Sequence, residues 1–394
     1  MTWEFATAAR IAFGPGAASQ IASAARAFGA RALLVTGRKP RHAARLVADL
    51  HNAGVGCTPF ASAGEPTLDT VRAGVETARR EGCDLVIACG GGSAIDAGKA
   101  IAAMLTNPGD VLDYLEVVGG AQPFRSAPAP FIAVPTTAGA GSEATRNAVL
   151  QSSEHGVKAS LRSPLLLPRL AVVDPELTLS APPDVTAATG LDALSQLIEP
   201  FVSLRANPFT DMLCREGLRR IARSLRRAFE DGNDLEARTD MSLASLLSGM
   251  ALANAGLGAV HGFAAPVGGA FPAPHGAVCA ALLAPVTRAN LRALRLRDPN
   301  SPALERYEEA ARLLDPGAQG ADSLVEWLDE IRSALRIPPL AAYGIREHDI
   351  PQLCEKAARA SSMKGNPVAL EKEELQAVLA EALGAPRVSS HFNR

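Results

Sequence analysis

Cysteine pairs and charge imbalance, which often reveal what a protein binds, are both missing from this 394-residue chain. Its six cysteines are scattered without a C-x-x-C pair, so neither a disulfide framework nor a zinc knuckle is indicated. Its 39 Lys and Arg nearly balance 41 Asp and Glu, for a formal net charge of −2. This balance provides no electrostatic footprint for nucleic acid or an anionic membrane, so we expect neither as a partner.

Long hydrophobic runs are absent as well. No window approaches the roughly 20 apolar residues of a membrane helix, and residues 1–14 lack the apolar stretch of a signal peptide. We therefore expect a cytoplasmic protein whose cysteines are buried thiols in a reducing compartment. At roughly 100–200 residues per domain, the length predicts two domains.

Short apolar runs bounded by Gly, Pro or Asp recur in the first part of the chain. They lie at residues 31–36, 84–89, 131–135 and 170–174, and helical patterns lie between them at 17–27, 42–53 and 67–81. Such runs suit strands buried on both faces of a parallel sheet. The alternation predicts an α/β domain over residues 1–181 with a doubly wound, mostly parallel sheet, typical of nucleotide binding.

From about residue 182 the strand-like runs stop, and a helical domain is predicted over 182–394. The helical patterns lie at 192–204, 208–229, 235–255, 278–293, 301–314, 326–335, 350–360 and 372–383. Gly- and Pro-rich stretches at 107–130 and 266–276 are predicted to be loops long enough to carry function.

Two small-residue loops follow predicted strands. Cys89-Gly-Gly-Gly-Ser93 opens a helix that continues through Asp96, and without Cβ atoms its backbone N–H groups can approach a pyrophosphate. Pro135-Thr-Thr-Ala-Gly-Ala-Gly-Ser142 offers hydroxyls for a ribose or nicotinamide. Each alone could be a plain turn, but two such loops after parallel strands favour a coenzyme cleft.

The turn after the first strand run bears on the choice of coenzyme. A carboxylate here would bind the 2′-hydroxyl of NAD, whereas the chain has Gly37-Arg38-Lys39. The two cations favour NADP, or tolerance of both coenzymes, over NAD alone. The alternative is an exposed basic turn with no such role.

Histidine is scarce, so the placement of the seven present is informative. His261 and His275 are 14 residues apart around the predicted Gly/Pro loop, and Asp192 and Gln196 share one helix face. Two imidazoles, a carboxylate and one further oxygen would make a four-ligand divalent site with room for a substrate oxygen. For a single histidine, a structural role at a helix end is the alternative.

These residues together resemble the iron-containing (group III) alcohol dehydrogenases over nearly the whole chain. The resemblance is carried by six segments: 13–16, 90–96, 135–137, 190–194, 260–276 and Ser361-Ser-Met-Lys-Gly-Asn-Pro367. It implies a dehydroquinate-synthase-like architecture, a homodimer and an NAD(P)-dependent enzyme that transfers hydride between a small alcohol or aldehyde and nicotinamide. The Fe²⁺ or Zn²⁺ ion would hold the substrate oxygen between the two domains.

The resemblance also implies functional residues. The metal ligands map onto Asp192, Gln196, His261 and His275. Coenzyme contacts map onto Gly37, Gly91, Gly92, Ser93, Thr136, Thr137, Lys158 and Leu179, and we add Asp96 and Ser142 from the two small-residue segments.

Two positions depart from the family pattern. Gln196 stands where a histidine ligand is usual, and its neutral carbonyl is expected to bind borderline metals less tightly and to leave the ion more electrophilic. Ala265 stands where another histidine near the nicotinamide is usual, which removes a candidate proton relay. No catalytic side chain is assigned, because no base is identifiable and water or a ribose hydroxyl could pass the proton.

Two other functions stay open at this stage. A maleylacetate-reductase-type enzyme shares the fold, and Arg146 or Arg162 would then hold a substrate carboxylate. A non-catalytic dinucleotide-binding protein with a decayed metal site is the third possibility. Retention of Asp192, His261 and His275 argues against it.

Overall fold

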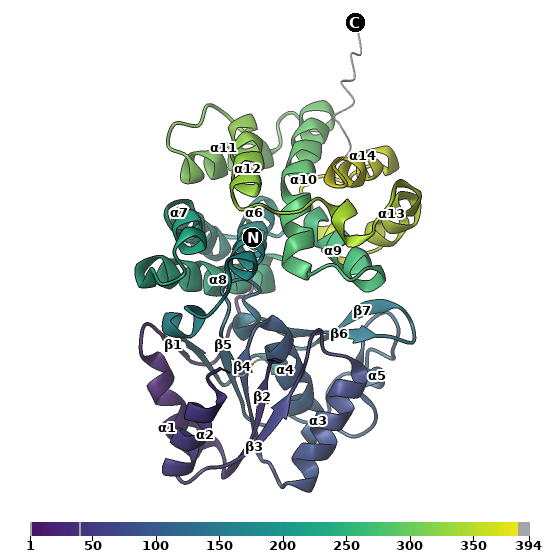
Figure 1. The fold of residues 1–394 in the computed structure, drawn as a ribbon. Coiled ribbons are helices and arrows are strands. Elements are labelled where there is room, and N and C mark those ends of the chain that lie inside the picture. The colour runs from purple at the N-terminus through teal and green to yellow at the C-terminus, as the bar shows by residue number, and fades with distance from the viewer. Residues whose placement is uncertain (1, 39–40, 385–394) are drawn as a thin grey trace, which may run out of the picture.

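A computed structural model describes residues 2–38 and 41–384. Figure 1 shows a sheet-containing half and a helical half joined in one molecule. The six parallel strands of the main sheet are β1 (Ile11–Phe13), β2 (Arg31–Thr36), β3 (Gly56–Ala61), β4 (Leu85–Gly90), β5 (Phe131–Pro135) and β8 (Leu170–Val173). The four strand runs expected from the sequence are confirmed, and β1 and β3 are additional.

The strand order is β1-β8-β5-β4-β2-β3, which makes the sheet doubly wound, as predicted. After β2 the chain moves outward to β3, and after β4 it moves outward in the opposite direction to β5. The order therefore reverses between β2 and β4, and the crevice at the carboxyl ends of these strands is where dinucleotides bind in such sheets.

Alternating residues of the strands face two helix layers. Ala32 and Leu34 of β2 pack toward α1 (Ile21–Phe28) and α2 (Ala43–Asn52), and Leu33 and Val35 pack on the other side. The second layer contains α3 (Leu68–Arg80), α4 (Gly92–Thr106) and the short α5 (Val111–Tyr114). Both faces of the sheet are thereby buried, which explains the continuous apolar strand runs.

An antiparallel hairpin follows β5 and was not predicted. Its strands are β6 (Asn147–Ser152) and β7 (Val157–Arg162). Lys99 of α4 is buried beneath it and donates from Nζ to the carbonyls of Thr145 and Asn147 at 2.8 and 2.9 Å, and to the Thr145 hydroxyl. A buried ammonium with three acceptors thus joins α4 to the hairpin.

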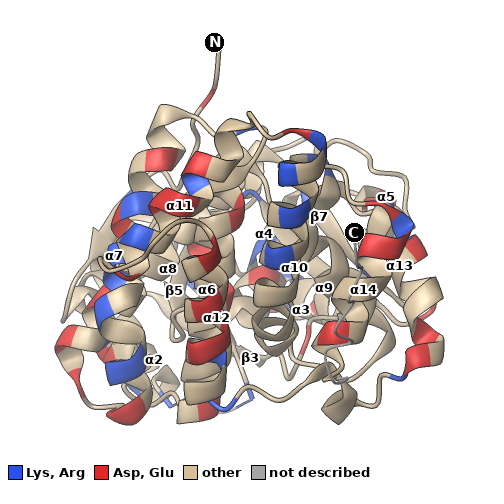
Figure 2. Cartoon of the chain, turned by 90° about the horizontal axis from the view of Figure 1, so that it is seen from above, with Lys and Arg blue, Asp and Glu red and all other residues tan. Residues whose placement is uncertain are grey.

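The helical half surrounds its own large core. Its helices are α6 (Pro183–Val202), α7 (Pro208–Glu230), α8 (Leu235–Ala255), α9 (Ala259–Ala270), α10 (His275–Arg297), α11 (Pro302–Leu314), α12 (Asp322–Ala334), α13 (Ile350–Ala358) and α14 (Lys372–Ala382). In the described residues, only α10 is by itself long and apolar enough to cross a membrane, yet 83% of its apolar window is buried within the protein. Acidic and basic residues are interspersed over the helices of this half (Figure 2).

The sequence placed several helix boundaries wrongly. The helical pattern at 192–204 belongs to a helix that begins at Pro183, next to the helix start that Pro182-Pro183-Asp184 predicts, whereas the helix expected at 278 begins at His275. The predicted loop at 266–276 is wrong for its first half, because α9 runs to Ala270 with Pro266 inside it. Burial of Val267 and Gly268 against the rest of the core outweighs the helix-breaking tendency of proline and glycine.

The two halves are also tied by the first residues of the chain. Ala6 exchanges two hydrogen bonds with the side chain of Asn254 on α8, at 2.7 and 2.9 Å. The rings of Trp3 and Phe5 lie against Phe209 of α7. Residues 1–181 and 182–394 as folding units stay a prediction, since this N-terminal strap crosses between them.

Candidate metal and coenzyme site

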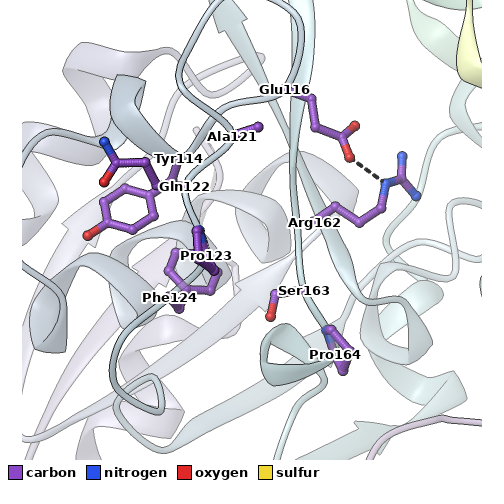
Figure 3. Close-up of a pocket in the computed structure, with 9 residues that line it drawn as sticks. All are labelled: Tyr114, Glu116, Ala121, Gln122, Pro123, Phe124, Arg162, Ser163 and Pro164. Carbon is purple, nitrogen blue, oxygen red and sulfur yellow. Dashed lines mark hydrogen bonds and ion pairs between the residues drawn. The ribbon is translucent and has the colours of Figure 1, made fainter.

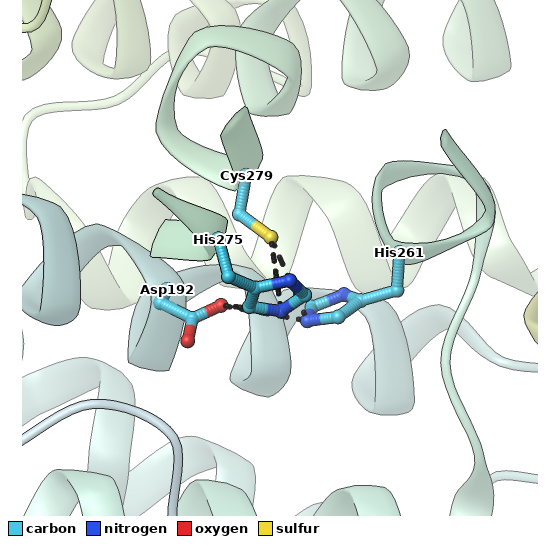
Figure 4. A group of neighbouring side chains, drawn as sticks. All are labelled: Asp192, His261, His275 and Cys279. Atoms are coloured by element: carbon cyan, nitrogen blue, oxygen red, sulfur yellow. Dashed lines mark hydrogen bonds and ion pairs between the residues drawn. The ribbon is translucent and has the colours of Figure 1, made fainter. Parts of the chain in front are cut away.

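Donor atoms from three helices converge at one point in the helical half (Figure 4). Asp192 comes from the middle of α6, His261 from the first turn of α9, and His275 is the first residue of α10. Asp192 Oδ1 lies 3.5 Å from Nε2 of His261 and 3.8 Å from Nε2 of His275. The Cys279 thiol, one turn along α10, completes a group whose ligand atoms all lie within 4.8 Å of one another.

The chemistry of this group fits a divalent cation. Asp192 Oδ1 is buried and has no hydrogen-bond partner, which is costly unless a cation faces it. Burial alone would raise the pKa of Asp192, but the imidazoles of His275 and His261 lower it. The negative charge of Cys279, and then of Asp192, raises the pKa of His275 to about 9. The cluster therefore attracts positive charge.

A buried carboxylate fixes the orientation of one imidazole. Glu199 Oε2 lies 2.6 Å from Nδ1 of His261, and Glu199 Oε1 accepts a hydrogen bond from the Val260 backbone N–H at 2.7 Å. An imidazole that donates from Nδ1 carries its lone pair on Nε2, the nitrogen that faces Asp192. Sequence reasoning missed Glu199, although it lies seven residues after Asp192 on the same face of α6.

The side-chain amide of Gln196 is directed toward the second small-residue loop. Its terminal nitrogen donates to the carbonyls of Gly139 and Ala140 at 3.2 and 3.3 Å, and the Ser248 hydroxyl of α8 lies 2.8 Å away. This orientation is the one that satisfies the amide, because the opposite one would place an oxygen against two carbonyls. Gln196 as a metal ligand stays a prediction.

The predicted coenzyme loops lie side by side at the reversal point of the sheet. A Cβ on Gly90 would be 3.4 Å from the Gly37 nitrogen, and a Cβ on Gly91 would be 3.3 Å from the Thr137 hydroxyl. The backbone N–H of Thr136 donates to the carbonyl of Gly90 at 2.9 Å. Because α4 begins at Gly92, its free N–H groups and Ser93 lie at this junction.

The second loop is also packed on the helices that hold the metal cluster. A Cβ on Gly139 would be 2.4 Å from the Thr189 side chain of α6, and Gly141 and Gly249 of α8 touch backbone to backbone. Gly141 has a φ of +60°, which favours glycine. Coenzyme loop and metal cluster are therefore held in one fixed arrangement.

Other predicted coenzyme residues lie farther from this junction or are buried. Asp96 is buried and accepts from the Val149 N–H at 3.0 Å, and its burial raises its pKa to about 6. Lys158 of β7 pairs with Glu65 at 3.2 Å. Leu179 follows β8, and Ser142 starts the turn beside Gly92. Direct coenzyme contact by these four residues stays a prediction.

The arginines considered for a substrate carboxylate are not part of the metal cluster. Arg162 pairs with Glu116 at 3.0 Å, and both line a surface pocket of the sheet half (Figure 3). This pocket contains none of the predicted metal or coenzyme residues. Ala265, where the family usually has histidine, is half-buried one turn after His261 on α9.

Comparisons with known proteins identify the family over nearly the whole chain. The family model "Iron-containing alcohol dehydrogenase" matches residues 8–175, and the model "Fe-containing alcohol dehydrogenase family, C-terminal" matches residues 186–383. The chain belongs to the iron-containing alcohol dehydrogenase family. It is thus an oxidoreductase that acts on CH–OH groups, in a family that uses NAD(H) and iron, and the resemblance noted from the sequence is confirmed.

Individual members of the family are similar over nearly their full length. The 1,3-propanediol dehydrogenase of Klebsiella pneumoniae is 36% identical over 384 residues, which cover 94% of this chain and 96% of that protein. A solved 1,3-propanediol oxidoreductase matches with a TM-score of 0.90 and 34% identity, covering 97% of this chain and 100% of that one. A sulfoacetaldehyde reductase from Bifidobacterium kashiwanohense in complex with NAD⁺ matches with a TM-score of 0.85 and 29% identity, over 98% and 100%.

Proposed function

We propose that this alcohol dehydrogenase interconverts small alcohols and aldehydes at the junction of its two halves. The ion would be held by Asp192, His261 and His275, and the coenzyme would lie on the loops at Gly37, residues 90–93 and residues 136–142. The observation that carries the proposal is the convergence of three buried or half-buried donors beside the loop that packs on α6.

Each part of the site has a defined task. The N–H groups at the start of α4 bind the pyrophosphate, and glycines at 91 and 92 permit close backbone approach. When bound, the cation polarises the substrate oxygen, while nicotinamide gives or receives the hydride. Glu199 keeps the His261 lone pair directed at the cluster. With Ala265 in place of histidine, we assign proton transfer to water or a ribose hydroxyl.

The coenzyme preference that we propose is NADP, or use of both coenzymes. This preference is supported by the lack of a carboxylate after β2, where the exposed Arg38 follows Gly37. Lys39, the second cation of this turn, lies outside the described residues. We also propose a cytoplasmic homodimer that uses Fe²⁺ or Zn²⁺. An exposed apolar group around Trp3, Phe209 and Met212 supports self-association.

One assay tests the function. Wild type and His275→Ala are loaded with Fe²⁺ or Zn²⁺ and assayed with NAD(H) and NADP(H) on short alcohols, aldehydes and keto acids. Wild type is expected to turn over alcohols and aldehydes, and His275→Ala to lose metal-dependent turnover while still binding the reduced coenzyme by fluorescence. Undiminished turnover in His275→Ala would remove the metal from the mechanism, and preferred turnover of maleylacetate would favour the reductase alternative.

A further inference from the structure

We propose that Cys279 is the fourth protein ligand of the metal, in the place that the family pattern gives to residue 196. This inference rests on the metal site proposed above and goes beyond it. Neither the family pattern nor the spacing of the histidines assigns a function to this cysteine. The sulfur would make the site one that prefers Zn²⁺ over the harder Fe²⁺.

Four of the six distances among the donors are close to those of a tetrahedral site, and the other two are within 4.8 Å. The Sγ of Cys279 lies 3.8 Å from Nε2 of His261 and 3.7 Å from Nε2 of His275, and Asp192 Oδ1 lies 3.5 and 3.8 Å from the same nitrogens. Zinc bonds of about 2.0–2.3 Å at tetrahedral angles would separate nitrogen from oxygen by about 3.4 Å and nitrogen from sulfur by about 3.6 Å. Each observed separation is within a few tenths of an ångström of these values.

The local hydrogen bonds leave these atoms facing one another as electron-pair donors. His261 donates from Nδ1 to Glu199, so its Nε2 presents a lone pair, and the buried Oδ1 of Asp192 has no hydrogen-bond partner. The Cys279 thiol faces both imidazole nitrogens and has one proton to donate, so it can satisfy only one of them, whereas a divalent cation would satisfy all four donors. Asp192, His261 and Cys279 are buried, and of the four donors only His275 is half-exposed.

Helix geometry favours the cysteine as a ligand of the same ion as His275. Cys279 lies four residues after His275 on α10, and residues at this spacing share one helix face. Gln196 instead directs its amide nitrogen at the carbonyls of Gly139 and Ala140. These contacts tie α6 to the coenzyme loop.

A cysteine in place of a neutral residue as the fourth ligand changes the total charge of the protein ligands. Asp192 and a Cys279 thiolate together carry two negative charges, which neutralise a divalent ion, whereas one aspartate with three neutral ligands leaves a net positive charge. The ion would accordingly be bound more tightly and be a weaker Lewis acid. The protein still supplies four ligands, as in the family pattern, and the substrate oxygen would be a fifth.

The test uses the full-length enzyme substituted with Co²⁺. Cobalt bound to a thiolate shows an intense sulfur-to-metal charge-transfer band in the near ultraviolet, which cobalt bound only to N and O donors lacks. We expect this band in wild type, in Gln196→Ala and in the control Cys354→Ser, which replaces another buried thiol of the helical half. Cys279→Ser should lose the band, and its Zn²⁺ affinity, measured by chelator competition, should fall at least tenfold.

Outcomes for the metal site and for the cysteine are separable. If wild type binds cobalt without showing the band, and His275→Ala and Gln196→Ala both lose the cobalt, the metal site is supported and the role of Cys279 is overturned. Failure of wild type to bind Co²⁺ or Zn²⁺ at all would overturn both. X-ray absorption on the wild-type zinc protein needs no variant and should show one sulfur at about 2.3 Å; its absence would also overturn the inference.

Discussion

Replacing Glu199 with glutamine changes one atom near the metal cluster and has a predictable cost. Both carboxylate oxygens accept hydrogen bonds, one from Nδ1 of His261 at 2.6 Å and the other from the Val260 N–H at 2.7 Å. Glutamine offers one acceptor and one donor, so one of the two buried N–H groups must face the new NH₂. Leaving a buried donor unsatisfied costs about 1–3 kcal/mol of unfolding free energy.

The metal should report the same change more specifically. If the NH₂ faces His261, the imidazole must place its proton on Nε2, the nitrogen that binds the ion, and Zn²⁺ affinity should fall about 10–100-fold. Chelator competition on Glu199→Gln measures this, with Glu309→Gln as control, because that carboxylate pairs with Arg215 at 3.0 Å and takes no part in the cluster. Unchanged Zn²⁺ affinity in Glu199→Gln would refute the orienting role.

Three further changes test the junction between the halves and the buried charges beside it. Gly249→Ala would place a Cβ 2.2 Å from the carbonyl oxygen of Gly141. The free energy of unfolding, measured by thermal denaturation, should therefore fall by about 1–3 kcal/mol, and the KM for the coenzyme should rise. Unchanged values of both quantities would contradict this contact. Lys99→Met leaves three buried acceptors without a donor, so the free energy of unfolding in urea should fall by about 3 kcal/mol or more. A decrease of less than about 1 kcal/mol would contradict a stabilising role of these hydrogen bonds. Burial raises the pKa of Glu143 to about 7 and that of Asp96 to about 6. The folded state therefore holds these two protons to higher pH than the unfolded state does. As the pH rises from about 4 to 7, the unfolding free energy should fall by up to roughly 3 kcal/mol per group. Glu143→Gln should flatten this profile, and an equally steep profile would place the effect elsewhere.

The sequence was informative where one local rule decides the structure. Apolar runs between glycines and prolines marked the strands 31–36 and 131–135, because a strand buried on both faces needs apolar residues at every position. Three residues of the cluster, Asp192, His261 and His275, were also predicted from the sequence to lie together, since so few histidines occur and two of them flank one glycine- and proline-containing segment. The family resemblance supplied the rest of that assignment.

What the sequence could not provide depends on helix phase and on contacts between distant segments. Cys279 was overlooked because the helix was expected to begin at residue 278, and only a start at His275 places the two side chains on one face. The hairpin at 147–162 was not predicted, and Lys99, which bonds to its first residue, lies 48 residues earlier in the chain. The orientation of Gln196 depends on two carbonyls more than 50 residues earlier in the chain.

The N-terminal strap limits how the two halves of this enzyme can move. The strap leads into β1, the link to α6 leaves from β8, and these two strands are neighbours at one edge of the sheet. Both crossings between the halves therefore lie together at the β1 edge of the sheet. Away from that edge, the backbone contact of Gly141 with Gly249 and the packing of Gly139 on Thr189 keep the coenzyme loop against the helices that carry the metal cluster.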